Sequence, residues 1–305
     1  MNSNQALVLG LWRRIRRRIA RTGLSLDTVA AGEAELTTVE ADLPAYLWVY
    51  REVLGPWLAS AAAAGDLADQ LVRWLHRHNQ FLYATAQTRA ELGQVYAQTL
   101  ADTAELLAEA RTEQEVEDGL PQLLAEHHQR LALALKVAFG ARLRDTVQAE
   151  YSPALQIAVL GLDRVETPVL DVGCGATAAL VDYLRDAGIE GVGMDRDAQA
   201  PGVVQADWLT QDYGRGIWGT VISHLGFSLH FLHHHLSDHD LAFDYARAYM
   251  RILGSLKVGG RFAYAPALPF LEEVLGDNYR VESRTFDGYG GGLPIESSTV
   301  VTRLA

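Results

Sequence analysis

Residues 168–175, PVLDVGCG, constrain this chain more than any other stretch. The first of them favour a buried strand that ends at Asp171. Gly173 and Gly175 lack side chains, so a ligand can approach the backbone of this turn closely. Residues 176–184 predict a helix whose N-terminal amides point at the turn. The stretch therefore predicts a site for a nucleotide-like cofactor.

The composition is that of an ordinary globular chain. It has 305 residues, 49% hydrophobic and 21% charged, which is enough for one large domain or two smaller ones. A single cysteine, Cys174, excludes an intrachain disulfide. The N-terminal residues lack a signal-peptide pattern, and no apolar run reaches the roughly 18–20 residues of a membrane span. We therefore expect a cytoplasmic protein without a membrane span. The formal net charge of −12 argues against nucleic acid as a partner.

Residues 12–21, WRRIRRRIAR, depart from the acidic average, because six of these ten residues are arginines. Val8, Leu11, Ile15 and Ile19 recur at helical spacing. One interpretation is a surface helix docked through this apolar stripe. The other is a basic face for an anionic partner, namely an acidic substrate, a membrane surface or a second subunit.

Residues 43–160 are rich in alanine, leucine and glutamate, which predicts an all-helical region. An apolar stripe at helical spacing predicts its core, through Leu67, Leu71, Trp74, Leu75, His78, Phe81 and Leu82. Alternatively, the helices form a lid in which Trp74, Phe81 or Tyr83 lines a substrate pocket. We expect the helices to break at Pro56, Gly65, Gly93, Gly119 with Pro121, and Gly140.

Beyond Glu166, short apolar runs alternate with amphipathic stretches, which predicts a parallel sheet covered by helices. The expected strands are residues 169–172, 191–194, 203–205, 219–223, 260–265 and 297–304, with a loop at residues 288–292. We thus predict two domains, residues 1–150 and residues 151–305. The fold class is α/β, a Rossmann-like sheet with helices on both faces, preceded by an all-helical region.

Five motifs occur in order from about Tyr151 to the end: residues 170–175 (LDVGCG), 191–197 (GVGMDRD), 205–209 (QADWL), 221–232 (VISHLGFSLHFL) and 251–266 (RILGSLKVGGRFAYAP). In this order they resemble the class I S-adenosylmethionine-dependent methyltransferases. Thr177 stands where that family usually has a third glycine. The resemblance implies a Rossmann-like methyltransferase domain that binds S-adenosyl-L-methionine and releases S-adenosyl-L-homocysteine.

The chemistry of that cofactor gives several residues expected roles. Asp195, 20 positions after Gly175, would accept both ribose hydroxyls beside Arg196. Asp207 would accept from the adenine amine, and Trp208 would pack on the ring. The amino-acid end of the cofactor falls to four further residues, Asp171, Gly173, Cys174 and Gly175. Ser223 would lie near the methyl donor.

Two other interpretations remain open. Residues 173–178, GCGATA, also fit the G-x-G-x-x-A fingerprint of nicotinamide-dinucleotide enzymes. Asp171, the second acid Asp207 and the expected C-terminal strand favour the methyltransferase instead. A fold that binds the cofactor without catalysis and serves as a scaffold is the other alternative.

Methyl transfer needs a base only if the acceptor holds a proton at working pH. Six of the ten histidines lie in residues 224–239, and His230 and His224 are the candidate bases. Alternatively, these histidines only fix the loop by hydrogen bonds. Their spacing would also suit a shared metal ion, with Asp238 nearby, but no cysteine is close and we predict no metal.

We expect a small organic acceptor, methylated on oxygen, nitrogen or carbon. The helical region would close over Phe227, Phe231 and Tyr264 to form an apolar, aromatic pocket. A homodimer through the N-terminal helices is also expected. The sequence does not identify the acceptor.

Overall fold

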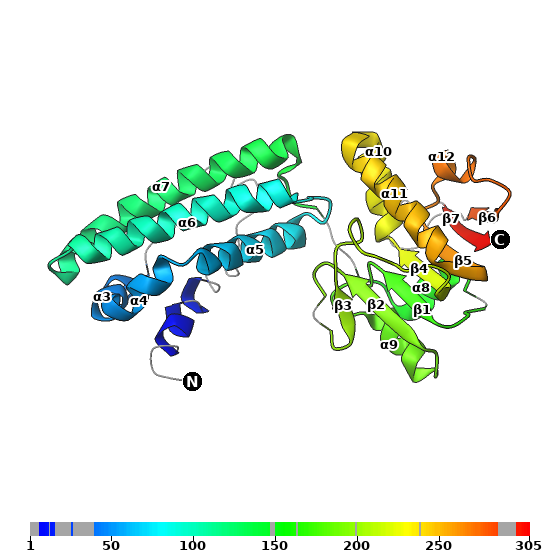
Figure 1. Ribbon diagram of the computed structural model, residues 1–305, viewed down its shortest axis with the longest axis horizontal. Coiled ribbons are helices and arrows are strands. Elements are labelled where there is room, and N and C mark those ends of the chain that lie inside the picture. Colours follow the sequence, from blue (N-terminus) through cyan, green and yellow to red (C-terminus); the bar gives the residue numbers. More distant parts are fainter. Residues whose placement is uncertain are drawn as a thin grey trace. The chain divides into compact units, whose positions relative to one another are not determined.

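In a computed structural model, the chain forms two compact units, Met1–Gln148 and Ala149–Ala305 (Figure 1). The residues that the structure describes are 6–11, 13–15, 26, 40–146, 150–162, 164–198, 200–237, 239–285 and 297–305. Three predictions lie wholly or partly outside them: the loop at 288–292, the metal-site candidate Asp238, and much of the arginine-rich stretch. None of the helices in the described ranges is long and apolar enough to cross a membrane.

The first unit is helical, as predicted. Its described helices are α3 (Leu43–Val49), α4 (Arg51–Leu58), α5 (Ala61–His78), α6 (Ala86–Glu109) and α7 (Glu113–Phe139), followed by the 3₁₀ turn η2 (Gly140–Arg142). α5 packs against α6, and α6 packs against α7, so the three long helices lie side by side (Figure 1).

The expected helix breaks are wrong except at Gly140, which follows α7 with a φ of 53°. Pro56 lies inside α4, Gly65 and Gly93 lie inside α5 and α6, and Gly119 and Pro121 lie inside α7. Gly119 allows close approach of two helices, because a Cβ there would lie 2.8 Å from the Leu106 Cδ1 atom of α6. Packing along these long helices outweighs the local preference of glycine and proline.

The helices begin instead at polar caps. The hydroxyls of Ser60, Thr85 and Thr112 accept hydrogen bonds from the backbone amides of Ala63, Thr88 and Glu115, at 3.3, 3.0 and 3.3 Å. Each bond satisfies one amide that the first helical turn leaves without a partner. These caps set the start of α5, α6 and α7.

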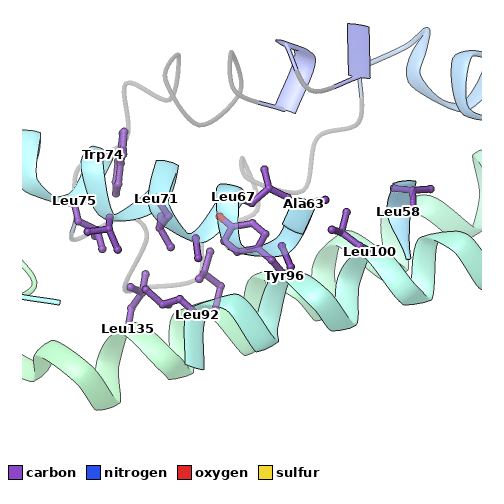
Figure 2. Packing of buried hydrophobic residues seen from close by; sticks show 14 of the residues in the cluster. Leu58, Ala63, Leu67, Leu71, Trp74, Leu75, Leu92, Tyr96, Leu100 and Leu135 are labelled. Atoms are coloured by element: carbon purple, nitrogen blue, oxygen red, sulfur yellow. The ribbon is translucent and has the colours of Figure 1, made fainter. Parts of the chain in front are cut away.

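The predicted apolar stripe is the core of this unit (Figure 2). Five of its seven members are buried, whereas His78 and Phe81 are partly exposed. Leu11 is buried in the same core, and Val8 and Ile15 pack against it. Docking through the predicted stripe is therefore confirmed for Val8, Leu11 and Ile15, and the basic-face interpretation stays a prediction.

The second unit holds a seven-stranded sheet in the order β3-β2-β1-β4-β5-β7-β6. Its described strands are β1 (Val169–Val172), β2 (Gly191–Asp195), β3 (Val203–Gln205), β4 (Trp218–His224), β5 (Leu256–Ala265), β6 (Tyr279–Thr285) and β7 (Ser297–Arg303). β1 to β5 pair in parallel, and β7 is antiparallel to both neighbours. All six predicted strands are present, and β6 is an additional one.

Two pairs of helices cover the sheet (Figure 1). α8 (Pro153–Leu160) and α9 (Ala179–Asp186) form one pair, and α10 (Phe227–Ser237) and α11 (His239–Ser255) form the other; the short helix α12 is Pro269–Glu272. On β5, Ala263 belongs to the core beneath α8, whereas the neighbouring Phe262 contacts the aromatic rings of α10 and α11. Successive side chains of a strand point to opposite faces, so the two pairs cover opposite faces.

Candidate functional site

The carboxyl ends of β1, β2 and β4 lie at one edge of the sheet, because these strands are parallel. β1 lies between β2 and β4, and the chain continues from β1 towards β2 but from β4 towards β5. This divergence is the topological switch point, outside which open α/β sheets bind their ligands. The predicted glycine turn directly follows β1, so it lies at this point.

Gly173 brings the loop after β1 against the loop after β4. Its φ is 82°, and a Cβ there would lie 3.0 Å from the Cα atom of Gly226 and 3.1 Å from Cζ3 of Trp208. A Cβ on Gly226 would in turn lie 3.0 Å from the backbone oxygen of Val172. Both positions therefore require glycine, and the turn presents bare backbone.

Asp171 is a buried carboxylate beside this turn. It is 2% exposed, and its Oδ2 atom has no hydrogen-bond partner among the described residues. Burial raises the pKa of Asp171 to about 7, and the nearby charge of Asp195 adds to the rise. A buried carboxylate that lacks a partner is costly, so a cationic group of a ligand would be stabilised here.

Asp195 ends β2 and is tied to the glycine turn. Its Oδ2 accepts from the backbone amide of Gly175 at 3.2 Å, and its Oδ1 accepts from that of Asp197 at 2.9 Å. Burial raises the pKa of Asp195. Each carboxylate oxygen has a second lone pair, so both can also accept from ligand hydroxyls.

Asp207 and Trp208 follow β3. The Oδ1 of Asp207 accepts from the backbone amide of Leu209 at 2.9 Å, and the residue is partly exposed. Trp208 is 5% exposed and donates from Nε1 to the hydroxyl of Tyr245 at 3.1 Å. The Arg196 guanidinium lies 5.8 Å from the centre of the indole ring. The Trp208 ring thus packs next to Gly173, and its stacking on an adenine stays a prediction.

Cys174 and Ser223 are held by the protein itself. The Cys174 thiol fills the space above Gly193, where a Cβ would lie 2.9 Å from its Sγ, and burial raises its pKa. It is therefore a packing residue. Ser223 donates to the Val172 oxygen at 2.8 Å and accepts from the Phe227 amide at 2.9 Å. Ser223 joins β1 to the start of α10, and a contact with cofactor would compete with these bonds.

His224 ends β4 next to the switch point. It is 7% exposed, its Nε2 has no partner within the described part of the chain, and its ring lies 5.1 Å from that of Tyr151. Burial lowers the pKa of His224 to about 4, so the ring is neutral at pH 7. The following residue, Leu225, has a φ of 55°, an unusual conformation for a branched side chain. With a pKa of about 4 the neutral ring is a weak base at pH 7, so the role of His224 as the catalytic base stays a prediction.

The second candidate base, His230, lies in the first turns of α10. It is 3% exposed, and its ring meets the edge of Trp208 at 5.0 Å. Two of the described histidines further along α10 also pack on aromatic rings, His234 on Tyr245 and His235 on Phe270. Within the described residues, no group of three or more histidine, cysteine or acidic side chains is arranged to hold a metal ion.

The three predicted pocket residues are fully buried, and their place in an acceptor pocket stays a prediction. Phe227, Phe231 and Tyr264 are 0%, 1% and 0% exposed. Both phenyl rings pack against Tyr245 of α11. The Tyr264 hydroxyl donates to Glu272 at 2.8 Å and contacts the Tyr249 hydroxyl at 3.0 Å. They form the core beneath the site, and closure of the helical unit over it stays a prediction.

Two residues beside the glycine turn, Glu150 and Tyr151, were not predicted from the sequence. Glu150 accepts a hydrogen bond from Thr177 at 3.3 Å, and Tyr151 contacts His224. They directly precede Ser152, which caps α8. An acidic and an aromatic residue before a helix cap are common, so the local pattern gave little signal.

The sheet order, with antiparallel β7 inserted between β5 and β6, is consistent with the Rossmann-like α/β fold that the sequence predicts. No protein-family profile matches the chain, and no curated protein matches it. Solved structures resemble about half of it. One is a protein of Streptococcus mutans assigned as a methyltransferase, in complex with SAH, with 16% identity over 52% of this chain and 100% of that chain and a TM-score of 0.33.

Two further likenesses are of the same kind. The glycopeptide N-methyltransferase MtfA, complexed with S-adenosyl-L-homocysteine, is 20% identical over 52% of this chain and 74% of its own, with a TM-score of 0.30. The CcbJ methyltransferase of Streptomyces caelestis is 15% identical over 56% of this chain and 79% of its own, with a TM-score of 0.27. These likenesses are too distant to transfer residue roles, so the roles proposed below come from this chain's own contacts.

Proposed function

We propose that this chain is an S-adenosyl-L-methionine-dependent methyltransferase that acts on a small organic acceptor. The observation that carries the proposal is Asp171, whose buried Oδ2 has no partner among the described residues beside a turn of bare backbone. S-adenosyl-L-methionine supplies a transferable methyl group on a sulfonium, and it also carries an ammonium group. A buried carboxylate favours such cationic groups.

The same charges argue against a dinucleotide. The pyrophosphate of a nicotinamide cofactor is negative, and at the glycine turn it would lie beside the buried Asp171, with Glu150 near Gly175. Like charges cost free energy in a poorly solvated site. The acidic surroundings likewise disfavour nucleic acid as acceptor, which supports a small molecule.

The residues divide the work as follows. Asp195 would accept from the ribose hydroxyls and hold the glycine turn in place through the Gly175 amide. Asp207 would accept from the adenine amine. Asp171 would pair with the ammonium group of the amino-acid end. These contacts orient the cofactor at the switch point, where His224 can take a proton from the acceptor.

Cofactor binding is tested first, by calorimetry with S-adenosyl-L-methionine, S-adenosyl-L-homocysteine and NAD. We expect saturable binding of the first two and none of NAD. Preference for NAD would overturn the proposal. A screen of small phenols, amines and activated carbon acids with labelled donor then tests transfer. Tight binding without transfer to any acceptor class would favour the scaffold alternative.

Replacement of Asp195 by alanine should weaken binding of both cofactor forms by about 10- to 100-fold. This range corresponds to the loss of hydrogen bonds to a charged acceptor, about 1.5–3 kcal/mol. Calorimetry gives the affinities, and thermal melting checks the fold. Asp182→Ala, at a carboxylate that is 63% exposed on α9, is the control and should bind normally. Equal affinities for the two variants would contradict the ribose assignment.

Replacement of His224 by alanine should lower kcat by about 10²-fold or more and leave cofactor affinity unchanged. The low pKa of His224 makes a second expectation, because the neutral ring is the active form. Activity that depends on this ring should fall only as pH drops through about 4, where the histidine becomes protonated. A loss centred near pH 6.5 that persists in the variant would exclude His224 as the base.

A further inference from the structure

The helical unit contains a cavity of its own, with a volume of about 210 Å³. Its walls are side chains of α3 to α7 together with residues near the N-terminus. Figure 2 shows Leu67 and Leu71 on α5 with Tyr96 and Leu100 on α6, and all four line the cavity. Trp74 lines it too, whereas Phe81 and Tyr83 are not among the lining residues. All described lining residues belong to the unit 1–148.

Polar groups gather on the α6 and α7 side of this apolar wall. The Thr99 hydroxyl donates to the Val95 oxygen at 3.0 Å, so it accepts from Nδ1 of His127 at 2.7 Å. His128, the next residue on α7, also lines the cavity and is 5% exposed. Its Nε2 has no hydrogen-bond partner among the described residues. Burial lowers the pKa of His128 below its ordinary value, so the ring is neutral at pH 7.

The charged lining residues are Arg14 and Glu40, with side chains 25% and 47% exposed, so they lie where the cavity reaches solvent. Arg14 pairs with Asp42 at 2.8 Å and with Glu40 at 3.6 Å. Arg14 is the one cation among the described lining residues, and it is already paired with Asp42 and Glu40. The described wall therefore offers no unpaired cation to an anionic ligand such as a fatty acid.

We propose that this cavity binds an uncharged small molecule with an apolar body of one or two rings and a single hydrogen-bonding group that pairs with His128. An apolar cavity of about 150 Å³ already holds benzene, so the volume here suits a somewhat larger body. A neutral imidazole can pair with a hydroxyl or an amide without the cost of burying a charge. The site is independent of the proposed cofactor site, because none of the latter's residues lines it.

Three probes of similar shape test the site on the full chain by equilibrium dialysis. These are 1-naphthol, the apolar 1-methylnaphthalene and the anion 1-naphthoate. We expect one saturable site for 1-naphthol, binding about 3- to 10-fold weaker for 1-methylnaphthalene, and weaker still for 1-naphthoate. Replacement of His128 by leucine should remove the preference for the hydroxyl. No saturable 1-naphthol site, or an unchanged preference in H128L, would overturn the proposal.

A second pair of variants locates the site. Leu131 lines the cavity on α7, and Leu133 on the same helix is 64% exposed. Leu131→Trp should fill the cavity and abolish binding of 1-naphthol, whereas Leu133→Trp should bind it as the native chain does. Circular dichroism checks that each variant is folded. Normal binding by a folded L131W, or loss of binding in L133W alone, would place the probe elsewhere and contradict the proposal. If L131W does not fold, the H128L comparison decides.

Discussion

The Asp171→Asn variant should be more stable than the native chain above pH 7 when no ligand is bound. The Asp171 carboxyl has a pKa of about 7 in the folded chain, against 3.8 for a solvated carboxyl. Between these values the folded state binds more protons than the unfolded state, so native stability falls as pH rises from about 4 to about 7. A pKa difference of three units corresponds to about 4 kcal/mol of lost unfolding free energy. Asparagine avoids this loss because it does not titrate.

Denaturant unfolding at pH 5 and pH 8 measures this effect as the difference between variant and native chain. The difference is needed because His224, whose pKa is lowered, contributes a pH dependence of the opposite sign below pH 6.5. Asp182→Asn on the surface of α9 is the control and should show no such change. A stability difference for Asp171→Asn that is equal at both pH values would contradict the prediction.

The same variant should bind S-adenosyl-L-methionine more weakly, because the negative charge that favours a cationic ligand is removed. Stability and binding would then change in opposite directions. A group that is unfavourable in the free protein and favoured by its ligand is typical of a binding site. Replacement of an aspartate with a merely structural role would instead lower the stability of the chain.

The strands of the second unit were predictable because buried parallel strands are short apolar runs, and the glycine turn has its own signal. β6 was missed since five of its seven residues are exposed. It is an edge strand held by backbone pairing with β7, which leaves little hydrophobic pattern. The helix after the glycine turn was placed three residues early. α9 begins at Ala179, because Ala178 has a φ of 50°.

The site was predictable in residue type but less so in orientation. Sequence spacing brought Asp171, Asp195 and the glycine turn together, since parallel strands end at one edge. Sequence spacing could not distinguish residues that face a ligand from residues that support the site, because residues of both kinds are apolar or small. Phe227 was assigned to the acceptor pocket and Ser223 to the cofactor; Phe227 is buried in the core, and Ser223 bonds to β1 and to the start of α10, so their ligand roles stay predictions. Tertiary packing decides such cases.

Replacement of Gly173 by alanine should cost about 2–5 kcal/mol of stability and greatly weaken cofactor binding. A left-handed φ costs a non-glycine residue about 1–2 kcal/mol. The new methyl group would also lie 3.0 Å from the Gly226 backbone and 3.1 Å from Trp208, and such overpacking costs about 1–3 kcal/mol. The contact on Gly226 is with a backbone atom, so no side-chain rotation can relieve it. The two loops must therefore move apart, and the turn that would hold the cofactor moves with them.

Gly188→Ala separates these two causes. Gly188 has a φ of 76°, close to the 82° of Gly173, but a Cβ there would meet nothing within 4 Å. This control should lose only the conformational part, about 1–2 kcal/mol, and bind the cofactor normally. Unfolding free energies and calorimetric affinities for S-adenosyl-L-homocysteine give the comparison. If both variants lost the same stability and both bound the cofactor, the contact between the two loops would not be what requires glycine at position 173.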